Sequence, residues 1–185
     1  MKKISKIIAS LLFITSLMLF SGCDNLSDIP LNIPIGVEFS LSGNETSLEG
    51  TTSFCLNQYK EWTDNKDALK SVSFISTSYW TKAVTPSDLS GTINIALKGA
   101  AGEPIFNVTM KDVALNTFIN KPYKIVLTKA EIDAFNGYLD GIKEGPDCTN
   151  PSFTAEINIS NITGSTSPYN ITGKIEIVLE AVVEP

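Results

Sequence analysis

Histidine and arginine are both absent from the 185 residues of this chain. Without histidine, the protein lacks the side chain that most often serves as general base and metal ligand. Without arginine, it has no bidentate donor for phosphate groups or guanine. The first 22 residues read as a removable leader, and the remainder carries 11 lysines against 20 acidic residues, a net charge of −9. A field of this sign repels nucleic acid, so we expect no nucleic-acid partner.

The N-terminus combines a short basic segment, an apolar run and a small-residue cleavage site. Three lysines precede an uncharged stretch over 7–20. This stretch is shorter than the roughly 20 apolar residues that a transmembrane helix needs, and the whole pattern predicts a signal peptide over 1–22. The residues Leu-Phe-Ser-Gly-Cys at 19–23 resemble the lipobox of bacterial lipoproteins, with Phe20 where leucine is commonest.

This resemblance implies cleavage between Gly22 and Cys23, diacylation of the Cys23 thiol and usually acylation of the new amine. Each buried CH₂ group adds about 0.8 kcal/mol, so two or three acyl chains hold a protein firmly on a bilayer. We therefore expect a cell-envelope protein anchored to a bacterial membrane, either the outer membrane or the periplasmic face of the inner membrane. An ordinary signal peptide that leaves Cys23 unmodified is the alternative.

The cysteine count agrees with lipidation. The chain has three cysteines, and acylation of Cys23 leaves the even pair Cys55 and Cys148. An exported, oxidising compartment favours a disulfide between them. Closing a loop of this length stabilises a fold by about 4–5 kcal/mol on the chain-entropy model. A redox or metal role is the alternative, but the pair lacks a CxxC spacing.

Alternation of apolar and polar residues predicts a mainly β domain over 35–185, preceded by a lipidated tether over 23–34 that contains Pro30 and Pro34. About eight strands separated by turn residues indicate an antiparallel β-sandwich. We expect strands near 35–41, 48–56, 72–82, 93–97, 106–110, 123–127, 153–159 and 171–183.

One segment has a helical period instead. Thr128 and Glu131 form a capping box, and apolar residues then recur at helical spacing, which predicts one amphipathic helix over about 129–142. We expect this helix to cover an open end or edge of a sheet. A shorter helical turn with Asp64 as its cap is predicted at 65–70.

Trp62, Tyr79 and Trp80 are candidate binding aromatics. A flat aromatic platform on a sandwich stacks against the C–H face of a sugar ring. The alternative is that Tyr79 and Trp80 point to opposite faces of one strand, so that one of them belongs to the core.

Catalytic motifs are missing from the sequence. It has no GxSxG elbow, P-loop, HExxH or dinucleotide fingerprint, and its acidic clusters lack the calcium-loop spacing. We therefore expect no enzyme activity, no metal site and no cofactor. The preferred function is a non-catalytic binding or structural module with a protein or glycan partner. The alternative is a periplasmic carrier of apolar ligands such as lipids, in which the 129–142 helix would act as a lid.

Overall fold

The computed structural model describes residues 28–142 and 152–184. Within these residues it contains eight strands in two antiparallel four-stranded sheets. The strands are β1 (Ile29–Gly43), β2 (Leu48–Phe54), β3 (Leu69–Thr85), β4 (Ser90–Gly99), β5 (Pro104–Ala114), β6 (Tyr123–Ile125), β7 (Phe153–Thr163) and β8 (Tyr169–Val183). Each strand that the sequence predicts is present, so the predicted β-sandwich is confirmed.

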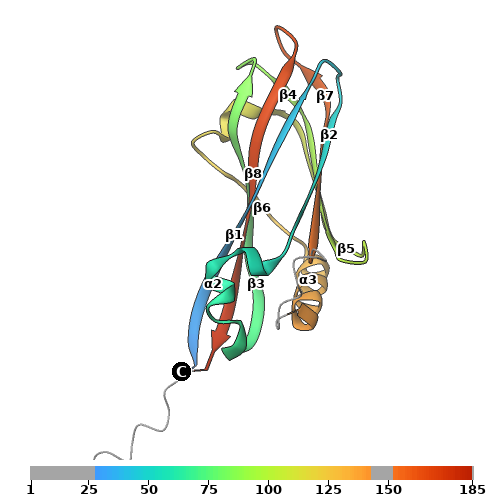
Figure 1. The fold of residues 1–185 in the computed structure, drawn as a ribbon. Helices are drawn as coiled ribbons and strands as arrows, with labels where there is room; N and C mark the ends of the chain where they lie inside the picture. The colour runs from blue at the N-terminus through green and yellow to red at the C-terminus, as the bar shows by residue number, and fades with distance from the viewer. Residues whose placement is uncertain (1–27, 143–151, 185) are drawn as a thin grey trace, which may run out of the picture. The chain divides into compact units, whose positions relative to one another are not determined.

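The order of the strands identifies the kind of sandwich. One sheet runs β1-β8-β3-β6 and the other runs β2-β7-β4-β5. Consecutive strands therefore lie in different sheets, except for the hairpin β4-β5, and the N-terminal and C-terminal strands lie side by side (Figure 1). This order is that of an eight-stranded jelly roll, in which two Greek keys are folded onto each other.

The core lies between the two sheets and is filled by inward-facing apolar side chains. In β8, alternate residues from Ile171 to Val183 are buried, and the residues between them are half exposed. Aromatic rings fill one end of the core, where Phe54 stacks on Phe153 with ring centroids 5.0 Å apart. Regular alternation places one residue in two inside, and this accounts for the clear strand signal in the sequence.

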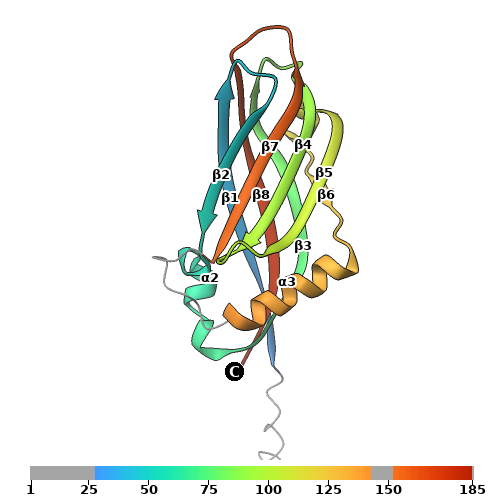
Figure 2. The ribbon, with the colours of Figure 1, turned by 90° about the vertical axis from the view of Figure 1, so that its right-hand side faces the viewer.

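The long helix α3 (Lys129–Ile142) has the predicted bounds and lies across one end of the sandwich (Figure 2). Its capping box is formed, because the Thr128 backbone N–H donates to Glu131 Oε2 at 2.8 Å and the Glu131 N–H donates to Thr128 Oγ1 at 3.3 Å. Phe135 is buried against Phe74, and Asn136 Oδ1 accepts a hydrogen bond from the Phe74 N–H at 2.8 Å. The helix therefore covers the edge of β3 that β6 leaves unpaired, as predicted.

The start of β1 differs from the prediction. The strand begins at Ile29, so residues 29–34 belong to the sheet and not to the predicted tether. Ile33 is fully buried, while Pro30 and Pro34 face outward. β1 is an edge strand, and an edge strand tolerates proline because its outer N–H groups have no ladder partner.

The short helices between β2 and β3 also differ from the prediction. They are η1 (Leu56–Gln58), α2 (Lys60–Thr63) and η2 (Lys66–Ala68), and the connection between β5 and β6 contains η3 (Leu115–Phe118). Asp64 is the C-cap of α2 and not the N-cap of the next turn. Lys60 forms an ion pair with this carboxylate across one helical turn.

Candidate functional site

The outer face of the β2-β7-β4-β5 sheet is polar along its middle strands. Register places Glu49 beside Asn158, and Asn158 beside Asn94. One step along the strands, Thr51 lies beside Glu156, and Glu156 lies beside Ala96. Apart from Ala96, these outward positions carry only amide, hydroxyl and carboxylate groups. The sheet therefore presents hydrogen-bonding groups in parallel rows on a rigid backbone.

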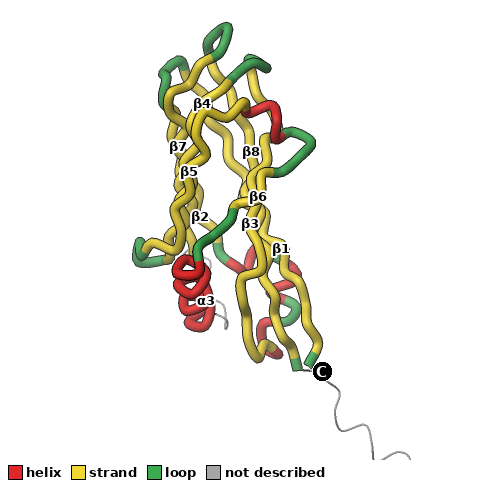
Figure 3. Tube along the Cα trace, turned by 180° about the vertical axis from the view of Figure 1, so that it is seen from behind, coloured by secondary structure: helices red, strands yellow, loops and turns green. Residues whose placement is uncertain are grey.

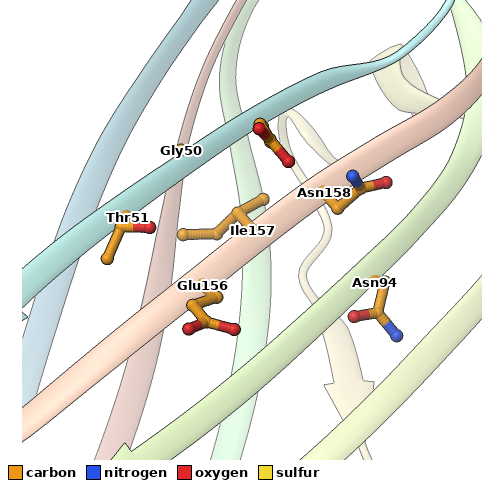
Figure 4. A pocket seen from close by; sticks show the side chains of 7 residues that line it. Gly50, Thr51, Asn94, Glu156, Ile157 and Asn158 are labelled. Carbon is orange, nitrogen blue, oxygen red and sulfur yellow. The ribbon is translucent and has the colours of Figure 1, made fainter.

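A hollow of about 600 Å³ lies over these rows, and we call it the polar hollow. Its lining residues are Glu49, Gly50, Thr51, Asn94, Glu156, Ile157 and Asn158. Figure 4 shows the side chains of Thr51, Glu156, Asn158 and Asn94 reaching it from three neighbouring strands. Ile157 is only 1% exposed and belongs to the core, so the polar hollow does not open into the interior beneath this residue.

Two of the lining side chains are held in place by their neighbours. Asn94 Nδ2 donates to Asn107 Oδ1 at 2.7 Å and to Thr109 Oγ1 at 2.9 Å. Both amide hydrogens of Asn94 are thereby engaged, which leaves Oδ1 as the acceptor that this residue offers to a ligand. Glu156 Oε1 accepts from Lys98 Nζ at 2.6 Å, which leaves Oε2 for a second donor. Acceptors fixed in this way lose little side-chain entropy when a ligand binds.

The predicted aromatic platform is not formed. Trp62 and Tyr79 are both 0% exposed and belong to the core, and only Trp80 reaches the outer face of its sheet. The Tyr79 hydroxyl shares a hydrogen bond with Thr81 Oγ1 at 3.1 Å, and burial raises the pKa of this phenol, with the hydrogen bond opposing the rise. Tyr79 and Trp80 therefore lie on opposite faces of β3, as the alternative interpretation predicted. Trp62 comes from a helical segment too short to show a period.

Trp80 remains half exposed but is covered by a cation. Lys174 lies opposite Trp80 in the register of β3 and β8, and its Nζ is 5.6 Å from the centroid of the indole ring. Lys174 also forms an ion pair with Glu176. The face of the indole is thus occupied by a side chain of the protein, which leaves less of it for a sugar ring.

The cysteine predictions lie largely outside the described residues. Cys23 and Cys148 are not among them, whereas Cys55 directly follows β2 and is 1% exposed. Phe54, the last residue of β2, pairs with Phe153, the first residue of β7. The chain therefore brings position 55 close to position 152, four residues from Cys148. Four residues span at most about 14 Å, so the pairing is within reach.

Among the described residues, no group of three or more histidine, cysteine, aspartate or glutamate side chains is placed to hold a metal ion. The same part of the chain has no helix of the length and apolar character required to cross a bilayer.

The polar hollow could not be recognised from the sequence alone. Its residues have no motif spacing and come from three strands that are distant in sequence. The signal in the sequence is that the outward positions of β2, β4 and β7 are nearly all polar. Recognising it as one surface requires the strand order, which depends on pairings between residues about 60 to 110 positions apart.

No protein-family model matches the chain, and no curated protein matches it. Several solved virus structures are similar to it. A structure of turnip yellow mosaic virus at 100 K has 12% identity and a TM-score of 0.40, and the match covers 85% of this chain and 94% of the viral chain. A second structure of turnip yellow mosaic virus has 9% identity and a TM-score of 0.42, covering 84% and 94%. A structure of infectious bursal disease virus, Gx strain, has 16% identity and a TM-score of 0.36, covering 85% and 33%.

Proposed function

We propose that this protein is a lipid-anchored cell-envelope protein that acts as a non-catalytic binding module, and that the polar hollow is its ligand site. The observation that carries the proposal is the contrast between a filled interior and a preorganised polar outer face. Strand residues that point inward, such as Ile95, Ile159 and Leu179, are 0% exposed and leave the sheets in direct contact. The surface is therefore where a ligand binds.

The chemistry of the polar hollow favours a hydroxyl-rich ligand. Asn94 Oδ1, Glu156 Oε2 and the Glu49 carboxylate are acceptors, while Thr51 and Asn158 supply donors as well. A neutral glycan has hydroxyl groups that donate and accept at short intervals, which matches rows of polar side chains on neighbouring strands. Lys98 offsets the charge of Glu156, so a neutral ligand meets a hollow that is only weakly charged. We therefore choose a glycan over a protein partner for this site.

The proposed anchor is the acylated Cys23. Because β1 begins at Ile29, only six residues, 23–28, separate the proposed lipid from the sheet. Fully extended, six residues span at most about 20 Å. This reach is half that of the predicted 23–34 tether, and it supports a domain that works close to its own membrane. The proposed disulfide between Cys55 and Cys148 fits the same exported location.

The absence of catalysis is part of the proposal. The hydroxyl–carboxylate pairs among the described residues support local structure. Thr128 and Glu131 cap α3, and Ser165 donates to Asp88 between two loops. Neither pair is among the residues that line the polar hollow. The filled interior likewise favours a binding module over the carrier of apolar ligands, which requires a cavity between the sheets.

A titration with soluble neutral oligosaccharides tests the ligand site. The probes are chitohexaose, cellohexaose and mannohexaose, and the readout is the NMR signals of the asparagine side-chain amides in the full chain. We expect one probe to shift the Asn158 and Asn94 amide signals. One hydrogen bond contributes about 1 kcal/mol and a charged one about 1.5–3 kcal/mol, so Asn94→Ala weakens binding about fivefold and Glu156→Gln at least tenfold.

The matched control is Ser160→Ala, which removes a polar group from the same face of β7 outside the lining of the polar hollow. This variant should bind like the wild type. Binding that Ser160→Ala weakens as much as Asn94→Ala does would place the ligand elsewhere on the sheet. Unchanged amide signals with all three sugars would overturn the glycan assignment.

A further inference from the structure

Exposed apolar side chains gather in one short stretch of the surface. Five large apolar side chains are exposed in the described residues, and three of them lie within eight positions: Ile119 at 38%, Tyr123 at 37% and Val126 at 79%. Isolated exposed apolar residues are ordinary, but a cluster of them on one protruding segment is typical of a surface that contacts another protein or a membrane.

Buried residues hold this segment in place. It leaves the core at Leu115, which is 0% exposed, and returns to it at Ile125, which is 2% exposed. Between them, the ring of Phe118 packs edge-on against Tyr79 at 5.7 Å and against Tyr123 at 5.6 Å. Figure 3 shows the loop between η3 and β6 standing out from the side of the sandwich. The exposed apolar side chains therefore project from a segment that buried residues hold in place.

The charge of the segment is opposite to that of the protein. Residues 113–127 contain two lysines and no acidic residue, in a chain with more acidic residues than lysines. Lys121 and Lys124 are both exposed, and neither forms an ion pair with a described residue. Lys124 lies beside Ser78, whose partner on the other side is Glu176, and that carboxylate is bound by Lys174. Both ammonium groups are thus free to meet an external anion.

The apolar and basic groups enclose a shallow site. A hollow of about 440 Å³ lies in the segment and is lined by Thr117, Phe118, Lys121, Pro122, Tyr123 and Lys124. Aromatic rings at the base and ammonium groups at the rim match a molecule that is anionic at one end and apolar at the other.

We propose that the segment 117–126 is a second membrane contact, which rests on the anionic headgroups of the bilayer that carries the lipid anchor. Tyrosine prefers the interface between headgroups and acyl chains, and lysine stems lie along apolar surface while their ammonium groups reach the headgroups. Ile119 and Val126 supply the apolar tips. Two lysines shift such a contact equilibrium roughly 30-fold on an anionic surface, since each contributes about 1 kcal/mol and 1.4 kcal/mol is a factor of ten.

The position of the segment suits this contact. β6 pairs with Thr77–Tyr79 of β3, about nine residues along β3 from Leu69, which lies beside Val183 at the end of β8. At about 3.3 Å per residue, the contact is roughly 30 Å from the end of the sandwich at which β1 begins. A tether of at most about 20 Å allows the strands to lie along the membrane and not stand upright on it. The proposal therefore rests on the proposed anchor at Cys23, but it has a readout of its own.

Hydrogen–deuterium exchange of the full chain in lipid nanodiscs tests the contact. One set of discs contains phosphatidylglycerol with phosphatidylethanolamine, and the other contains phosphatidylcholine alone. We expect the amides of 117–126 to exchange more slowly in the anionic discs than in phosphatidylcholine discs or detergent. The double variant Lys121→Gln/Lys124→Gln should lose this protection, and Val126→Ser should reduce it. The control Lys66→Gln/Lys111→Gln removes the same charge elsewhere and should keep the protection.

Equal exchange in anionic discs and in detergent would overturn the proposal. So would protection that appears in detergent and grows with protein concentration, because it would assign the segment to a second copy of the chain. A different result would refute the proposed lipid anchor. If intact-mass measurement finds Cys23 unmodified, but added anionic discs still protect 117–126 in a lysine-dependent way, the second contact stands and the anchor alone is wrong.

Discussion

The substitution Gly173→Ala tests how tightly the two sheets are packed. Gly173 lies in β8 and faces inward under the ring of Phe39. A Cβ atom at this position would lie 2.4 Å from Phe39 Cζ, 2.7 Å from Phe39 Cε1 and 2.9 Å from the Trp80 carbonyl oxygen. Real Cβ atoms do not make contacts this short, so both the ring and the backbone of β3 must move.

The magnitude follows from two opposing effects. Overpacking a core costs about 1–3 kcal/mol, while replacing a strand glycine by alanine recovers about 0.5–1 kcal/mol of chain entropy. We therefore expect Gly173→Ala to lower the free energy of unfolding by about 1–2 kcal/mol. At 2–4 °C per kcal/mol for a chain of this size, the melting temperature falls by roughly 2–8 °C. Urea unfolding followed by tryptophan fluorescence measures the change.

Gly36→Ala is the matched control, because Gly36 lies in β1 of the same sheet and faces outward. A Cβ atom there meets only Lys174 Cδ at 3.4 Å, so this variant should gain up to about 1 kcal/mol. The double variant Gly173→Ala/Phe39→Leu should recover part of the loss, since the smaller side chain frees the space. If Gly173→Ala were as stable as Gly36→Ala, the interior would not be packed as described.

Two further substitutions test the helix, and a thiol assay tests the cysteines. Gly137 lies in α3 with open space around its Cα, so Gly137→Ala should raise the free energy of unfolding by about 1 kcal/mol in urea titrations, and no gain would contradict its exposed position. At Glu131, burial raises the pKa of the carboxyl group, but hydrogen bonds from Thr128 and the Asn107 N–H outweigh it and hold the pKa below its ordinary value of 4.5. The stabilisation by this carboxylate is therefore complete above pH 4.5 and is lost as the pH falls through the lower folded-state pKa. The free energy of unfolding of Glu131→Gln should thus differ from that of the wild type near neutral pH and converge with it in acid. A difference that does not change with pH would refute the role of the carboxylate. Protein purified from the envelope without reductant should show no free thiol at Cys55 or Cys148, and labelling of both by a maleimide would exclude the proposed disulfide.

The sequence predicted the parts of the fold that depend on local pattern. Alternation located all eight strands, because an inward residue such as Ile175 and an outward one such as Glu176 differ sharply in polarity. The capping box at Thr128 located α3 because its two hydrogen bonds are local. The predicted start of β1 was wrong because regular alternation begins only at Ile35, whereas the strand begins at Ile29 and, as an edge strand, admits Pro30 and Pro34.

The candidate site was beyond the reach of local pattern. Asn94 and Glu156 become neighbours on one face only when β4 and β7 pair, and their sequence separation carries no signal of that pairing. Trp62 was predicted as a binding aromatic because aromatic residues are frequent in binding surfaces, but the short helix α2 turns it into the core. Residues 117–126 were overlooked because two lysines and scattered apolar residues resemble an ordinary strand and turn.

Native mass spectrometry of the full chain, extracted gently from the envelope, tests most directly the claim that a lipid-held protein works through its outer surfaces. We expect a mature chain that begins at Cys23 and carries the mass of covalent acyl chains, and the Lys121→Gln/Lys124→Gln variant should retain no other lipid. A noncovalent lipid that this variant still binds in stoichiometric amount would contradict the claim, because the lipid would then lie in a cavity between the sheets and the protein would be a carrier.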